Sequence, residues 1–196
     1  MSTIFTIGHS TRPVAEFVAL LQQVAVDRLV DVRSVPRSRI SPQFNIDALP
    51  NALAVARISY VHLRALGGLR HGRRDEEKSP TRFWQNASFA NYADYAETVA
   101  FRRGLQELTM TALDHCCAIM CAEAVWWRCH RRIISDYLLA EGVTVAHILG
   151  HNRIDLATLT PGAHILPGGK VLYPDASATL GSAAAIQTRL AKPECG

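Results

Sequence analysis

Ile4-Phe-Thr-Ile-Gly8-His9-Ser10 is an apolar, strand-like run that ends in an imidazole and a hydroxyl, and this arrangement recurs along the chain. Other apolar runs precede or enclose further reactive side chains: Asp31 and Arg33, His62, Cys121 and Glu123, and His147. In an open parallel sheet, ligands bind outside the carboxyl ends of the strands, where loops diverge and helix N-termini point at the ligand. The pattern therefore predicts one functional site at that edge of a sheet.

The segments between these runs carry apolar residues at helical spacing, such as Phe17, Leu20 and Leu21 after Pro13. Further helices are expected over residues 46–56, 89–113 and 127–141, and strands over 4–8, 29–33, 58–63, 116–121 and 143–149. Strands separated by helices are typical of parallel sheets with right-handed crossovers. We therefore expect a three-layer α/β fold, with a mostly parallel open sheet of about five strands and helices on both faces.

The pattern changes after Gly150, where proline and glycine become frequent. We expect an α/β domain over residues 1–150 and a C-terminal extension over 151–196. In the extension, Gly168-Gly169 is typical of a hairpin turn, and residues 176–190 are expected to be helical. Residues 66–80 are rich in glycine and charge and lack periodicity, which predicts a long exposed loop.

Composition narrows the class of protein. The 196 residues are 48% hydrophobic, without a leader-like start or a run of 18 apolar residues, so we expect a cytoplasmic protein with no membrane partner. Five cysteines are an odd number and indicate reduced thiols. The net charge is +4, carried by 18 arginines and three lysines, which favours a small anionic ligand and permits nucleic acid without requiring it. The oligomeric state is left open.

The densest reactive cluster runs from Cys121 and Glu123 to Cys129, His130 and Arg131. If a strand ends near Cys121 and a helix begins near Trp126, Cys129 falls close to the first helical turn, where amide donors favour a thiolate. Alternatively, Cys121 is a small buried apolar residue that ends a core strand. The ligand spacing differs from that of zinc ribbons and fingers, so no metal site is predicted, and no cofactor is identified.

Two other groups are candidates for binding. Gly8, His9 and Ser10 resemble an anion cradle at a helix N-terminus, although Ser10 or Thr11 can instead simply cap that helix. Asp31 and Arg33 share one face of a strand, and a buried Asp31 requires a partner, for which Arg33 is the nearest candidate. The sequence has neither a phosphate-binding loop nor a dinucleotide-binding glycine motif.

Several of these motifs also occur together in a known family. They are Thr6-Ile7-Gly8-His9-Ser10, Asp31-Val32-Arg33 with Pro36 and Ser38, Leu66-Gly67-Gly68, Cys121-x-Glu123, Cys129-His130-Arg131, and His147-Ile148. Over residues 3–150 the chain resembles the family called domain of unknown function 488. The resemblance implies a similar architecture and brings no settled reaction.

The first functional hypothesis is an enzyme acting on a small anionic, nucleotide-like or nucleic-acid-derived substrate. Cys121 or Cys129 would be the nucleophile, and Glu123, His9 or His130 would move protons. The expected substrate-binding residues are Gly8, Ser10, Asp31, Arg33, Ser38 and Arg131. The alternatives are a module that binds a nucleotide or modified base without turnover, and a thiol redox protein in which Cys121 and Cys129 form a reversible disulfide.

Overall fold

The computed structural model describes residues 3–70 and 83–174. The predicted helix at 176–190 and residues 71–80 of the predicted loop lie outside the described residues. Within them, no helix is long and apolar enough to cross a membrane.

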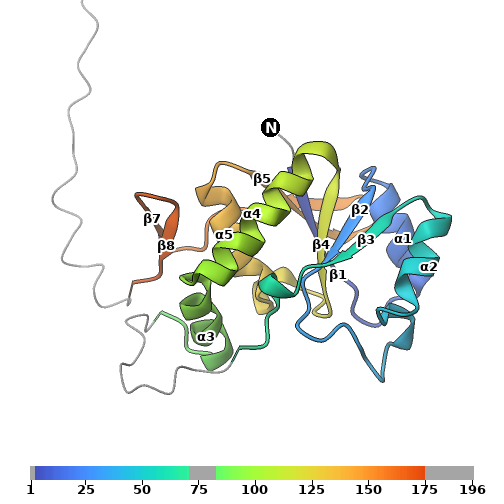
Figure 1. Cartoon of the computed structure of the whole chain (residues 1–196), viewed down its shortest axis with the longest axis horizontal. Coiled ribbons are helices and arrows are strands. Elements are labelled where there is room, and N and C mark those ends of the chain that lie inside the picture. The colour runs from blue at the N-terminus through green and yellow to red at the C-terminus, as the bar shows by residue number, and fades with distance from the viewer. Residues whose placement is uncertain (1–2, 71–82, 175–196) are drawn as a thin grey trace, which may run out of the picture.

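A six-stranded sheet forms the centre of the molecule (Figure 1). Its strands are β1 (Thr3–Gly8), β2 (Arg28–Asp31), β3 (Ser59–His62), β4 (Cys117–Cys121), β5 (Thr144–Gly150) and β6 (Arg153–Leu156). They lie in the order β3-β2-β4-β1-β5-β6; the first five are parallel, and β6 pairs antiparallel with β5. The predicted α/β class is confirmed, with one strand more than expected.

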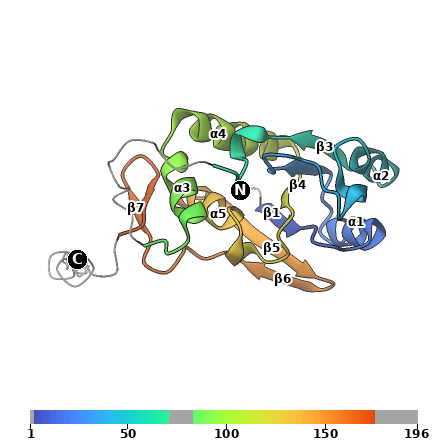
Figure 2. The same ribbon diagram turned by 90° about the horizontal axis from the view of Figure 1, so that it is seen from below.

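Helices cover both faces of the sheet, because successive strand residues point to opposite sides. On one face, α1 (Val14–Gln22) and α2 (Leu49–Val55) pack against strand residues such as Ile7 and Met120. On the other face, α3 (Ala87–Ala96), α4 (Val99–Asp114) and α5 (Arg131–Ala140) pack against Ile4 and Ile119. Figure 2 shows α1 and α2 on the side of the sheet away from α4 and α5.

Helix boundaries differ from the prediction where local hydrogen bonds decide them. The expected helix at 89–113 is two helices, because the Thr98 side chain accepts from the amide of Phe101 and starts α4. The expected helix at 127–141 begins later, after the 3₁₀ turn η3 (Trp126–Arg128). At α1 the N-cap is Pro13 with no capping side chain, so the expected cap by Ser10 or Thr11 is wrong.

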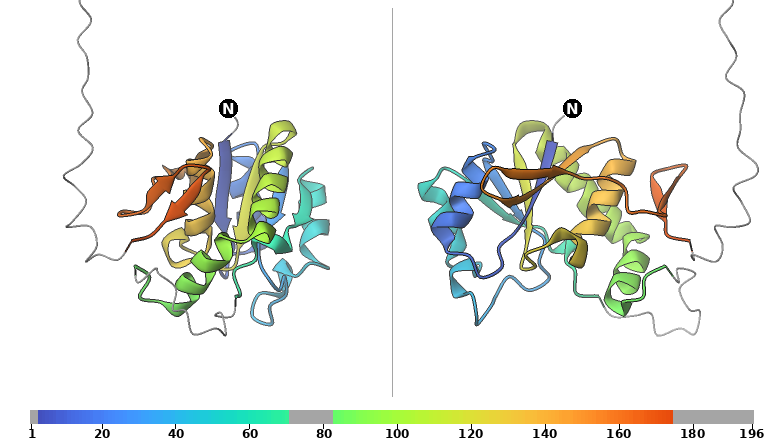
Figure 3. Two further views of the ribbon diagram at one scale, coloured as in Figure 1. Left: turned by 60° about the vertical axis from the view of Figure 1, so that its left-hand side comes forward. Right: turned by 180° about the vertical axis from the view of Figure 1, so that it is seen from behind.

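Beyond the sheet, β7 (His164–Leu166) and β8 (Lys170–Leu172) form the predicted hairpin, in which Gly168 and Gly169 have positive φ. The hairpin lies beside α5, at the end of the molecule away from α1 and α2 (Figure 3). Asp136 of α5 accepts hydrogen bonds from the Thr160 amide and the Tyr173 hydroxyl, each at 2.8 Å. The segment after residue 150 is thus joined to the sheet through β6 and to α5 through a buried carboxyl.

Candidate functional site

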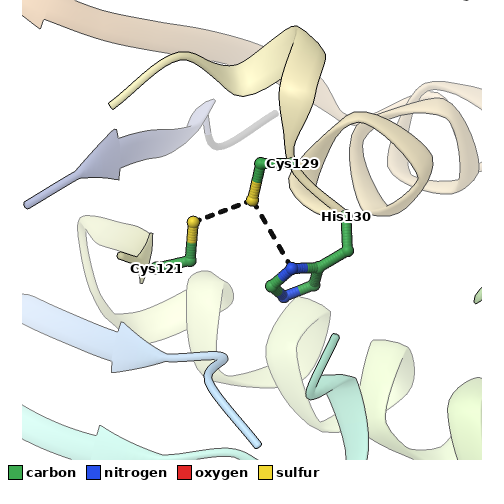
Figure 4. A group of neighbouring side chains, drawn as sticks. All are labelled: Cys121, Cys129 and His130. Carbon is green, nitrogen blue, oxygen red and sulfur yellow. Dashed lines mark hydrogen bonds between the residues drawn. The ribbon is translucent and has the colours of Figure 1, made fainter. Parts of the chain in front are cut away.

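Two cysteines meet at the carboxyl edge of the sheet. Cys121 is the last residue of β4, and Cys129 follows η3 and precedes α5. Their Sγ atoms are 2.8 Å apart, and each side chain is 2% exposed (Figure 4). Because β4 lies between β2 and β1, this pair stands at the centre of the edge where the sequence predicted a site.

His130 completes the cluster. Its Nε2 donates to the carbonyl of Val32 at 2.9 Å, which places a proton on Nε2 and directs Nδ1 toward Cys129 Sγ, 3.4 Å away. Gly68 lies against the same ring, where a Cβ would be 2.3 Å from Nδ1. The Leu66-Gly67-Gly68 motif therefore makes room for the imidazole beside the thiols.

Arg131 is the charge partner of the two sulfurs. It is 1% exposed, and its Nε lies 3.1 Å from Cys121 Sγ and 3.4 Å from Cys129 Sγ. Its other hydrogen bonds go to the Glu123 carbonyl and the Thr6 hydroxyl, and none of the ion pairs among the described residues includes it. A buried guanidinium requires a compensating negative charge, which a thiolate of this pair supplies.

The two thiols are therefore unequal. Burial alone disfavours ionisation of Cys129, but the hydrogen bond from Cys121 and the charges of His130 and Arg131 outweigh it and hold the Cys129 pKa well below its usual value. Burial and the same hydrogen bond raise the pKa of Cys121 well above its usual value. The arrangement corresponds to a Cys129 thiolate that accepts a hydrogen bond from the Cys121 thiol.

A cavity of about 470 Å³ opens onto this cluster. Both cysteines and His130 lie on its wall, together with Glu123 and Arg128. Its remaining lining is partly polar, with Ser34, Asn86 and Ser88, and partly aromatic, with Phe89 and Tyr92. A small molecule can therefore reach the sulfurs, although they are almost fully buried.

The part of the chain that forms this cluster also shows which family the protein belongs to. A family model described as Domain of unknown function DUF488 matches residues 13–138, which include the cysteines, His130 and Arg131. The chain belongs to the DUF488 family. No curated protein and no solved structure matches it. Within the DUF488 region, the sulfur cluster and its cavity are the features that can carry chemistry.

Asp31, the last residue of β2, and Arg33 form the predicted ion pair in the DUF488 region. Arg33 Nε and Nη2 donate to the Asp31 carboxylate at 2.9 and 2.5 Å, and the Tyr60 hydroxyl donates to the same carboxylate at 2.7 Å. Arg33 also donates to the Phe44 carbonyl. Tyr60 and Phe44 were missed in the sequence, because ordinary core aromatics carry no sign of a polar partner.

His9 belongs to this second network and not to the sulfur cluster. Its Nδ1 donates to the Ser10 carbonyl at 2.7 Å, its Nε2 accepts from Arg33 at 3.2 Å, and its ring stacks on Phe44. Burial lowers its pKa to about 4, so the ring is neutral. Since both ring nitrogens already have protein partners, His9 has no free nitrogen for the proton transfer expected of it.

The backbone amides of the expected anion cradle at Gly8 and Ser10 form hydrogen bonds within the chain. The amides of His9 and Ser10 donate to the carbonyls of Cys121 and Ala122 at 2.9 and 3.0 Å. A Cβ at Gly8 would overlap the Glu123 carbonyl, so this glycine lets the 122–124 segment cross the end of β1. The amides of His9 and Ser10 thus position the cysteine loop and are not free to bind a ligand.

Ser38 and His147 also lie outside the cluster. The Ser38 hydroxyl accepts from the Ser41 amide, a bond within its own loop. His147 is buried, bonded to Thr6 and stacked on Trp126, and burial lowers its pKa to about 4. Among the predicted residues, the structure thus brings together Cys121, Glu123, Cys129, His130 and Arg131, with Arg33 at the cavity wall.

Two sulfurs and an imidazole nitrogen within 4.8 Å of one another are also ligands of the kind that bind Zn²⁺. The guanidinium of Arg131 touches both sulfurs, so a cation there would meet a positive charge at close range. The pairing of thiolate with guanidinium already accounts for the buried charge. The donor set therefore fits thiol chemistry better than a divalent metal.

Proposed function

We propose that this DUF488 protein is a thiol-dependent enzyme in which Cys129 attacks a small anionic substrate bound in the cavity. The observation that carries the proposal is the buried Arg131, whose guanidinium contacts the two sulfurs and, among the described residues, pairs with no carboxylate. Cys121 and His130 contact the Cys129 sulfur and can hold or return its proton.

Arg128 supports an anionic substrate. It lies on the cavity wall, and among the described residues none of the ion pairs includes it. Arginine grips carboxylate or phosphate through two hydrogen bonds. The aromatic side chains of Phe89 and Tyr92 add apolar surface, so a nucleotide-like molecule suits the cavity as well as a simpler anion.

Alkylation by reagents of different charge tests both parts of the proposal. The full chain is treated at neutral pH with iodoacetamide or with anionic iodoacetate, and labelling is followed at Cys129 and, as an internal reference, at the half-buried Cys116. We expect Cys129 to react faster than Cys116 and to favour iodoacetate relative to that reference.

In Arg128→Gln the preference of Cys129 for iodoacetate should fall several-fold while the iodoacetamide rate stays the same, since only the anion contacts Arg128. Arg103→Gln, at an exposed position on α4, is the matched control. A Cys129 that reacts no faster than Cys116 would rule out the nucleophile, and a preference unaffected by Arg128→Gln would rule out the anion site.

A further inference from the structure

We propose that Cys121 and Cys129 are a dithiol couple that reduces hydroperoxides, with Cys129 attacking and Cys121 resolving. This inference rests on the proposed role of Cys129 as the nucleophile. It assigns to Cys121 a function that substitution chemistry at Cys129 does not require, and it names a second class of substrate for the cavity.

The contact between the two sulfurs supports it. Among the described cysteines, Cys121 has the Sγ nearest to that of Cys129, at 2.8 Å, and Cys116 and Cys117 lie at the other end of β4. Both sulfurs are 2% exposed, so another protein's thiol is kept away from them, while a hydroperoxide is small enough for the cavity. The resolving group must then come from within the chain.

The chemistry closes in two steps. The Cys129 thiol first gives its proton to solvent, and the thiolate attacks the terminal oxygen of ROOH; the S–O bond forms, the O–O bond breaks, and the alkoxide takes that proton back from solvent to leave as ROH. Cys121 then attacks the Cys129 sulfenic acid; the S–S bond forms, the S–O bond breaks, and the hydroxide leaves as water with the Cys121 proton. In sum, two thiols and ROOH give a disulfide, ROH and water.

Intact-mass and peptide analysis tests the couple on the full chain. The reduced protein receives one equivalent of hydrogen peroxide under nitrogen. We expect the wild type and the control Cys116→Ser to lose two hydrogen atoms, with the peptides of Cys121 and Cys129 joined and released again by dithiothreitol. In Cys121→Ser the reaction should stop at a Cys129 sulfenic acid that dimedone captures, and Cys129→Ser should consume peroxide at least tenfold more slowly.

Two results would overturn the couple: Cys129 that proceeds to sulfinic acid in the wild type as readily as in Cys121→Ser, or a disulfide that involves another cysteine. Because the wild-type measurement needs no variant, a folding defect in a mutant does not affect it. Rapid alkylation of Cys129 without disulfide formation would refute this inference and leave the proposed function standing. Slow alkylation together with inert thiols would refute both.

Discussion

Arg131 is the residue on which the reactivity of the site depends. It is nearly fully buried, touches both sulfurs and also donates to the Glu123 carbonyl, so one side chain holds the end of β4, the following loop and the start of α5 together. The two cysteine side chains raise the pKa of its guanidinium, although burial alone would lower it. Arg131 therefore both supplies the positive charge beside the sulfurs and holds the surrounding segments in place.

Replacing Arg131 by Gln should raise the Cys129 pKa above neutral and slow its alkylation at pH 7 by roughly tenfold or more, because each unit by which the thiol pKa exceeds the pH lowers the thiolate fraction about tenfold. The measurement is the iodoacetamide rate in a Cys121→Ser background, with Arg103→Gln as the control. An unchanged rate would mean that Arg131 does not stabilise the thiolate.

At this scale the sequence predicted residue types better than residue roles. Cys129, His130 and Arg131 were expected together, because adjacent residues at a helix start must be close in space. The hydrogen bond between His9 Nε2 and Arg33 was not foreseen, since no sequence pattern shows which group this nitrogen contacts. The importance of Gly68 depends on a contact with a ring 62 positions later, which only the folded chain brings about.

Among the elements, the loop that carries Gly68 and the start of α5 fit against each other. In Gly68→Ala the new Cβ would overlap the ring of His130, which must then move away from Cys129. We expect disulfide formation and Cys129 alkylation to slow several-fold. Gly150→Ala is the matched control, because a Cβ there meets nothing within 4 Å. Equal rates for the two variants would show that the ring position is unimportant.

The strands were predicted more accurately than the helices. The inner parallel strands β1, β2, β4 and β5 are short, largely apolar runs, and their burial leaves a direct sequence signal, whereas the edge strand β3 is only partly buried. The division between α3 and α4 depends on one capping hydroxyl at Thr98, and β6 alternates polar and apolar residues over only four positions, all of them exposed. Such elements are fixed by a single hydrogen bond or by an available neighbouring edge, which periodicity does not report.

For the whole molecule, Asp136 ties the segment after residue 150 to α5. Tyr173→Phe removes one of the two hydrogen bonds to this buried carboxyl. The free energy of unfolding measured in urea should therefore fall by about 1–3 kcal/mol. Leu156→Ala is the control, because its side chain is 73% exposed and should matter little. Equal losses in both variants would argue that the segment is not anchored through Asp136.

Acid should destabilise the fold through His9 and His147. Burial lowers both pKa values from 6.5 to about 4, so the unfolded chain binds more protons between these limits. The stability that the two neutral rings contribute is fully present above pH 6.5 and is lost as the pH falls toward 4. Near pH 5 each histidine should lower the free energy of unfolding by about 2 kcal/mol relative to neutral pH.

Urea unfolding at about pH 7.5 and pH 5 checks this dependence. His147→Asn keeps an amide that can bond Thr6 but does not titrate, so it should lose roughly half as much stability between the two pH values as the wild type. The comparison concerns the slope with pH and not absolute stability, which the smaller side chain also changes. A slope equal to that of the wild type would exclude His147 as a contributor.

The buried guanidinium of Arg131 also affects how readily a disulfide between the two cysteines would be reduced. In the dithiol form its charge is matched by a thiolate, whereas a disulfide is neutral and would leave Arg131 enclosed with no anion beside it. Stabilising the reduced form makes a disulfide a stronger oxidant. Once oxidised, this cysteine pair should therefore accept electrons readily from small thiols that can enter the cavity.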